Sequence, residues 1–218
     1  MKKLLPLLIA AALAPQAAHA DVRITEWMYA GGSGEFVEFT NLGSTTVDFS
    51  GWSYDDDSRL AGVFDLSAFG LVAAGESVII TEVDADTFRF DWSLGSTVKV
   101  LGGYTNNLGS SDEINLFDAS GNLVDRLTYG HATVGGPRTQ NASGWAGSFA
   151  ALGANDATQW VLASVGDAES SYRSLSGAIG SPGFTTYAVA APVPEPETYA
   201  MLLAGLGIIG AVARRRTR

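Results

Sequence analysis

Cysteine is absent from the 218-residue chain, and charged residues are scarce. Without a thiol, the sequence has no disulfide, thiolate zinc site, iron–sulfur cluster or cysteine nucleophile. Charged residues make up 17 % of the chain, below the ~25 % typical of soluble domains. The net charge of −10 argues against a nucleic-acid partner bound by phosphate neutralisation. Glycine, in contrast, occurs 26 times, which favours short strands joined by tight turns over a helical bundle.

The first 20 residues have the pattern of a secretory signal peptide. Two lysines precede an apolar stretch at 4–13, and Ala18 and Ala20 occupy the −3 and −1 positions before Asp21. We therefore expect the Sec translocon to export the chain and the signal peptide to be cleaved before Asp21.

The C-terminal end has three parts in a fixed order. A linker at 188–197 contains a Pro-Glu-Pro motif, an uncharged apolar run fills 198–213, and a basic cluster occupies 214–218. Sixteen residues span ~24 Å as a helix, which is short of the ~30 Å hydrocarbon core but sufficient if the bilayer thins. We predict a transmembrane helix at 198–213, with the arginines held on the cytoplasmic side. The motif residues are Pro194, Glu195, Pro196, Arg214, Arg215 and Arg216.

This order of parts resembles the PEP-CTERM sorting signal of Gram-negative bacteria. In that family the membrane protease exosortase recognises the tail, processes it near the Pro-Glu-Pro motif and delivers the protein to the cell surface or an extracellular polysaccharide matrix. The resemblance implies export through the inner membrane, transient residence there, and exosortase as a partner. Extracellular polysaccharide is a further candidate partner, and whether the tail is cut or retained stays open.

Residues 21–187 have the pattern of strands and turns. Alternating or β-branched segments recur every 8–15 residues, with glycine, asparagine and aspartate between them. Three consecutive aliphatic residues in 77–82 predict an internal strand buried on both faces, and 84–91 is the one segment with a possible helical period. The pattern predicts an all-β antiparallel sandwich. Strands are expected at 22–28, 35–41, 46–49, 51–54, 63–66, 77–82, 98–101, 113–117 and 123–129.

Four motifs of the body resemble, in order, those of the lamin tail domain family. They are Thr25-Glu26, the strand from Glu35 to Asn41, the segment from Val47 to Trp52, and the hairpin from Asp118 to Asp125. The resemblance implies an immunoglobulin-like sandwich and a non-enzymatic module. Residues 180–183 resemble the closing segment of bacterial members, and we expect 138–190 to wrap back onto the sandwich. The motif residues with an implied structural role are Glu26, Glu38, Asn41, Gly51, Trp52 and Asp125.

The sequence offers little catalytic machinery. His131 is the one histidine beyond the signal peptide, and no Gly-x-Ser-x-Gly motif supplies a nucleophile. Glu26, Glu35 and Glu38 could converge as paired carboxylates if the first two strands pair, although a glycosidase needs such acids in an open cleft. We predict that the protein is not an enzyme, with a small extracellular hydrolase as the alternative.

Asp55, Asp56 and Asp57 form the densest acidic segment. Calcium takes six to eight oxygen ligands, but the chain has no Asp-x-Asp-x-Asp-Gly loop, and adjacent residues at a strand end point to opposite faces. We therefore expect a solvated charge run and assign no cofactor. A calcium-dependent adhesion or carbohydrate-binding module remains an alternative to a structural or binding domain in a polysaccharide-rich envelope.

Overall fold

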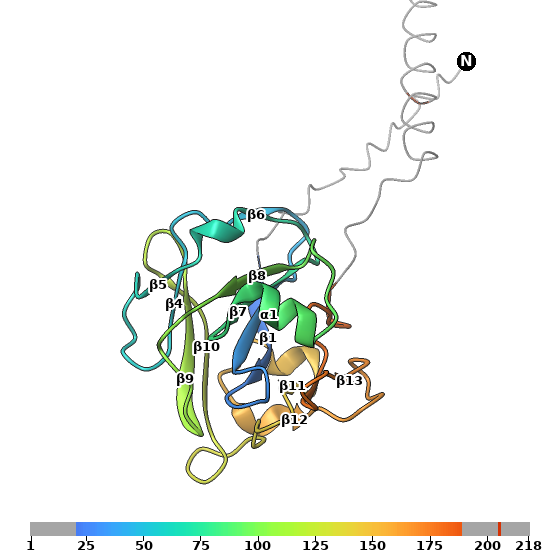
Figure 1. The fold of residues 1–218 in the computed structure, drawn as a ribbon. Helices are drawn as coiled ribbons and strands as arrows, with labels where there is room; N and C mark the ends of the chain where they lie inside the picture. The colour runs from blue at the N-terminus through green and yellow to red at the C-terminus, as the bar shows by residue number, and fades with distance from the viewer. Residues whose placement is uncertain (1–20, 189–204, 206–218) are drawn as a thin grey trace, which may run out of the picture.

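The computed structural model describes residues 21–188 and Gly205 (Figure 1). The predicted signal peptide at 1–20, the Pro-Glu-Pro motif at 194–196 and the arginine cluster at 214–218 lie outside these residues, as does the predicted membrane helix at 198–213 apart from Gly205. Within the described part of the chain, no helix is long and apolar enough to cross a membrane.

Two stacked sheets make up the domain. The larger sheet has the order β12 (Trp160–Leu162), β11 (Gly144–Ala146), β1 (Val22–Met28), β2 (Phe36–Asn41), β7 (Ser77–Thr81) and β8 (Lys99–Gly102). The smaller sheet has the order β10 (Leu123–Gly130), β9 (Ser111–Phe117), β4 (Ser53–Asp55) and β5 (Phe64–Asp65). The predicted all-β sandwich is confirmed.

Shorter elements complete the described fold. Two small ribbons pair β3 (Val47–Asp48) with β6 (Leu71–Val72) and β13 (Tyr172–Arg173) with β14 (Ile179–Gly180). The helix α1 (Ala85–Asp91) begins at Asp84, whose side chain accepts hydrogen bonds from the backbone of Asp86 and Thr87. Single 3-10 turns lie at Ser67–Phe69, Phe149–Ala151 and Ala157–Gln159.

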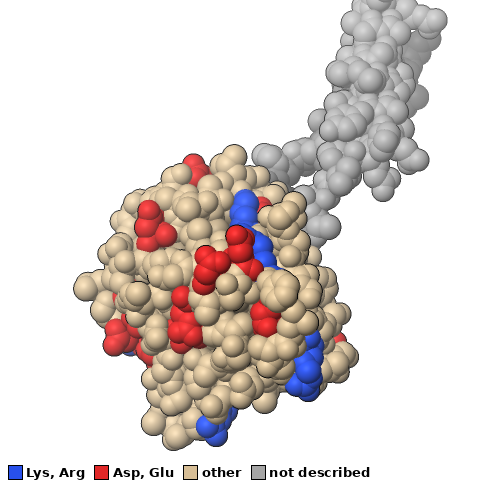
Figure 2. All heavy atoms as spheres, viewed as in Figure 1, with Lys and Arg blue, Asp and Glu red and all other residues tan. Residues whose placement is uncertain are grey.

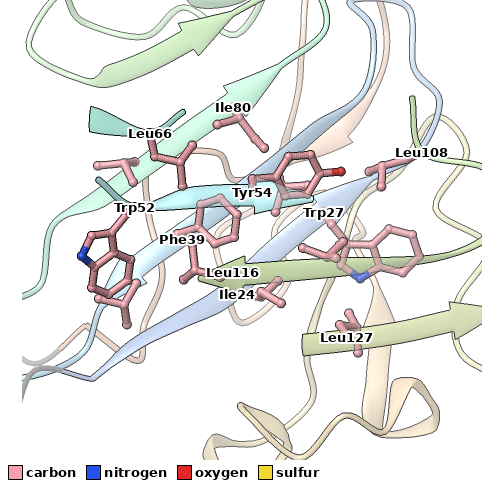
Figure 3. Packing of buried hydrophobic residues seen from close by; sticks show 14 of the residues in the cluster. Ile24, Trp27, Phe39, Trp52, Tyr54, Leu66, Ile80, Leu108, Leu116 and Leu127 are labelled. Carbon is pink, nitrogen blue, oxygen red and sulfur yellow. The ribbon is translucent and has the colours of Figure 1, made fainter. Parts of the chain in front are cut away.

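The main core lies between the two sheets (Figure 3). Ile24 and Trp27 of β1 both point into it, although residues three apart on a regular strand face opposite sides. A bulge between Ile24 and Glu26 shifts the pairing of β1 with β2 and resolves this conflict. The same shift leaves Glu26 opposite Glu38 in the register.

The outer face of the larger sheet is also covered. Val78 and Ile80 of β7 belong to the core between the sheets, whereas Ile79 belongs to a second cluster that includes Phe88 and Trp92 from α1 and its end. The prediction of an internal strand buried on both faces is therefore confirmed. The second cluster consists of Met28, Phe36, Ile79, Phe88, Trp92, Val100 and Ala178.

The topology departs from the expected one at a single pair within the larger sheet. The strands β7 and β8 run parallel, so the prediction of a wholly antiparallel sandwich is wrong there. The reason is α1, which lies between these two strands in the sequence and returns the chain to the starting end of the sheet, as a parallel pair requires.

The segment after β10 wraps back onto the domain, as expected, and also contributes two strands to the larger sheet. β11 pairs directly with β1, and β12 pairs with β11, so this segment extends the larger sheet. The N-terminal strand is consequently internal, and the two ends of the domain are joined in one sheet.

Candidate functional site

Glu26 and Glu38 converge on the outer face of the larger sheet. The two residues oppose each other in the pairing of β1 with β2, and both are buried. Among the described residues, neither forms an ion pair with a lysine, an arginine or a histidine. Burial, followed by the charge of Glu38, raises the pKa of Glu26 to about 8. Burial raises the pKa of Glu38 to about 7.

These carboxylates hold the segment 180–183, which we call the closing segment. Oε1 of Glu26 accepts a hydrogen bond from the Ser181 N–H at 2.8 Å, and Oε2 of Glu38 accepts one from the Gly183 N–H at 2.5 Å. A Cβ on Gly180 would lie 2.7 Å from Oε1 of Glu26, so the close approach requires glycine. The pair therefore lies beneath bound backbone and not in an open cleft.

Side-chain hydroxyl groups provide further hydrogen bonds to both carboxylates. Ser143 Oγ donates to Glu26, and Thr25 Oγ1 donates to Oε1 of Glu38 at 2.7 Å. The hydroxyl of Thr40 lies 3.3 Å from the same oxygen. These partners come from segments far apart in the sequence, and sequence reasoning did not identify Ser143 as one of them.

Glu35 does not join this pair. Glu35 lies directly before the first residue of β2, and its Oε1 accepts a hydrogen bond from the Leu108 N–H at 2.8 Å. Burial raises its pKa to about 8, although the Leu108 hydrogen bond acts in the opposite direction. Of the three glutamates considered as catalytic carboxylates, the structure thus brings only Glu26 and Glu38 together.

Asn41 forms hydrogen bonds with backbone groups of neighbouring segments. Asn41 Nδ2 donates to the carbonyl groups of Thr45, Val72 and Ala73, and its Oδ1 accepts from the Gly43 N–H.

Asp125 connects the two sheets. Its Oδ2 accepts a hydrogen bond from the Ile24 N–H at 2.9 Å, at the β1 bulge, and its Oδ1 accepts one from the Arg126 N–H. Burial raises the pKa of Asp125 to about 6. The β10 strand is itself bulged beside this residue, so one carboxylate fixes irregular positions on both strands.

Gly51 and Trp52 shape the turn that leads into β4. Gly51 has a φ of +77°, a conformation that favours glycine. The Trp52 ring stacks on Phe49 with a centroid separation of 4.5 Å and is largely buried. Gly51 and Trp52 therefore have a structural role in this turn.

The expectation of a solvated charge run at 55–57 is wrong for two of its three residues, because Asp55 and Asp56 are buried. Asp55 accepts hydrogen bonds from the Ser58 hydroxyl and the Arg59 N–H, whereas Asp56 accepts one from the Asn106 side chain. Asp57 is exposed. Across residues 21–188, no group of three His, Cys, Asp or Glu side chains is arranged to hold a metal ion.

An open hollow of about 440 Å³ lies on the outer side of the β9–β10 hairpin. Its lining includes a bidentate pair between the Arg59 guanidinium and the Glu113 carboxylate, which also accepts a hydrogen bond from Thr128 at 3.0 Å. His131, exposed in the loop that follows β10, does not line the hollow. The lining residues are Asp57, Arg59, Ser111, Asp112, Glu113, Thr128, Tyr129 and Val134.

On the face shown in Figure 2, charged side chains form small separate groups on a mostly uncharged surface. That face has no extended basic patch of the kind that binds nucleic acid.

Comparison with known families gives two matches. The family model of the Lamin Tail Domain matches residues 15–131. The chain belongs to this family. The matched range ends just after β10, so β11, β12 and the closing segment lie beyond it. The model of the PEP-CTERM protein-sorting motif matches residues 192–216, which include all six predicted motif residues. Searches of curated proteins and of solved structures gave no match.

The sorting motif implies processing by exosortase at the membrane and sorting to the cell surface or extracellular space.

Proposed function

We propose that this chain is an exported surface or matrix protein whose lamin tail domain has a structural or binding role and does not catalyse a reaction. The observation that carries the proposal is the order of the two family matches, with the sorting motif directly behind the domain. A signal peptide at 1–20 and a membrane helix at 198–213 complete the proposed route.

The arrangement of the buried carboxylates supports a non-enzymatic role. Glu26 and Glu38 bind backbone and hydroxyl groups of their own domain, which leaves no space for a substrate between them. A paired-carboxylate hydrolase needs its two acids on either side of an open cleft.

Intact-mass measurement tests the sorting part of the proposal. The full chain is expressed in a host that contains exosortase and in the same host without it. With exosortase we expect a surface form that begins at Asp21, ends near Pro196 and lacks Arg214–Arg218. Replacing Glu195 with Ala should abolish this processing, whereas Ala191→Ser, outside the matched motif, should leave it intact. A surface form that retains the arginines would contradict cleavage of the tail.

Extracellular polysaccharide is the proposed ligand class, and the hollow beside Arg59 is its proposed position. The guanidinium and carboxylate groups there are hydrogen-bonded to each other and line the hollow, where they can exchange hydrogen bonds with sugar hydroxyl groups. Pull-down of the surface form with the host's own exopolysaccharide should succeed. Arg59→Ala should weaken it, and the exposed Arg173→Ala should not. Equal binding by both variants would contradict this position, and turnover of the polysaccharide would contradict the non-enzymatic role.

A further inference from the structure

Two buried acids without a cation partner hold the last part of the described domain before the sorting motif. Glu26 and Glu38 face each other across β1 and β2, and the closing segment 180–183 lies on them. Ser181 is separated by 155 residues from Glu26, and Gly183 by 145 residues from Glu38, so these contacts join the two ends of the domain.

Among the described residues, no lysine, arginine or histidine of a neighbouring element forms an ion pair with Glu26 or Glu38. Tyr172 of β13 is the titratable side chain beside the pair, and its hydroxyl donates to the Trp92 carbonyl at 2.6 Å. Burial, together with the charges of Glu26, Asp91 and Glu38, raises the pKa of Tyr172 to about 12, so it stays neutral. The other polar groups on the pair are the hydroxyls of Ser143, Ser181, Thr25 and Thr40, and Ser77 of β7 contacts Thr40.

Two ionised carboxylates cannot share such a site at low free energy, because burial and mutual repulsion both favour a retained proton. The backbone N–H groups of Ser181 and Gly183 each satisfy one oxygen, but neither carries a full positive charge. We propose that Glu26 and Glu38 form a proton-dependent latch that keeps the closing segment docked while the pair is protonated and lets it detach as the protons leave.

The direction of the pH dependence follows from the docked state. Burial raises the pKa of both carboxyl groups above the 4.5 of an exposed glutamate, to about 8 for Glu26 and about 7 for Glu38. The docked state therefore binds more protons than the detached state. Docking is most stable below pH 4.5, and its stability is lost progressively as the pH rises to about 8.

The contacts on either side of the closing segment make this detachment local. Before it, Ile179 of β14 exchanges backbone hydrogen bonds with Asn141 and Ser143. After it, the Thr186 N–H donates to Glu169 at 2.7 Å, and the Tyr187 hydroxyl donates to the Ala146 carbonyl at 2.7 Å. Gly180 pairs with Tyr172 of β13, and beyond Gly180 the hydrogen bonds that hold residues 181–183 to the larger sheet all end on the two glutamates.

Amide hydrogen exchange at Ser181 and Gly183 measures the latch directly. In the full chain, held in detergent micelles, the protection factors of these amides, corrected for intrinsic exchange, should fall as the pH rises from about 5 to about 8. The fall should be about tenfold per pH unit for each proton released, with a plateau above pH 8. In Glu26→Gln combined with Glu38→Gln, the protection factors should not depend on pH.

Glu35→Gln is the matched control, because Glu35 is another buried glutamate whose pKa is raised to about 8, and it accepts a hydrogen bond from Leu108 and none from the closing segment. It should keep the wild-type pH profile at Ser181 and Gly183. Wild-type protection that does not change with pH, or a dependence that persists in the double variant, would overturn the latch. If the double variant does not fold, Glu38→Gln alone should reduce the dependence from two protons to one, and an unchanged two-proton dependence would overturn it equally.

Discussion

Replacing Tyr54 with Phe should stabilise the domain. Tyr54 is fully buried in β4, and its hydroxyl has no hydrogen-bond partner among the described residues. A buried polar group without a partner costs about 1–3 kcal/mol, so removing the oxygen while keeping the ring should be favourable. We expect a gain of about 1 kcal/mol in the free energy of unfolding, which corresponds to a rise of about 2–4 °C in Tm for a domain of this size.

Tyr129→Phe provides the matched control. Tyr129 is also buried, but its hydroxyl donates to the Gly109 carbonyl at 3.1 Å. Its removal should lower the free energy of unfolding by about 1 kcal/mol, because the hydrogen bond is lost and the carbonyl is left unpaired. Thermal melts and urea unfolding of the full chain and both variants give the comparison. If Tyr54→Phe lowers Tm as much as Tyr129→Phe does, the Tyr54 hydroxyl has a stabilising partner and the reasoning fails.

Three further changes test other parts of the fold. Asn41→Ala should lower the free energy of unfolding by at least about 2 kcal/mol, because buried backbone groups lose their hydrogen-bond partner. Replacing the exposed Asn107 with Ala should change it by no more than about 0.5 kcal/mol. Equal urea midpoints for the two variants would contradict this. Gly51→Ala should lower the free energy of unfolding more than Gly62→Ala does. Both glycines have positive φ, but of the two only Gly51 would bring an added Cβ within 4 Å of another residue, Ala119. Equal Tm values for the two variants would contradict an effect of the Ala119 contact. A chain ending at residue 131 should lose cooperative unfolding because β1 loses β11, and a sharp melt with native near-UV circular dichroism would contradict that.

The main elements of the sandwich could be predicted from the sequence because their signals are local. The aliphatic run in β7 and the Asp118–Asn122 turn are interpretable without knowledge of distant partners. β11 could not be found in this way, because it has three residues and its identity as a strand depends on pairing with β1.

In the candidate site, too, local sequence signals could be interpreted, whereas contacts between distant segments could not be predicted. The resemblance to the lamin tail domain family singled out Glu26 and Glu38, but the bulge that brings them opposite each other has no sequence signature. Their partners Ser143 and Ser181 are separated from Glu26 by 117 and 155 residues, so no spacing rule connects them. The burial of Asp55 and Asp56 could not be predicted either, because it depends on partners such as Asn106, which is 50 residues from Asp56 in the sequence.

The pairing of β1 with β11 has a consequence for the timing of folding during export. In a chain translocated from its N-terminus, β1 arrives first, yet β11, one of its two neighbours in the sheet, follows more than one hundred residues later. Such a high contact order slows folding, because a long loop must close before the strands can pair. Among the described residues, the last hydrogen bonds to earlier segments of the domain are those of Thr186 and Tyr187, shortly before the sorting motif begins at 192. A chain exported as proposed would therefore complete its fold only as the sorting motif follows it through the translocon.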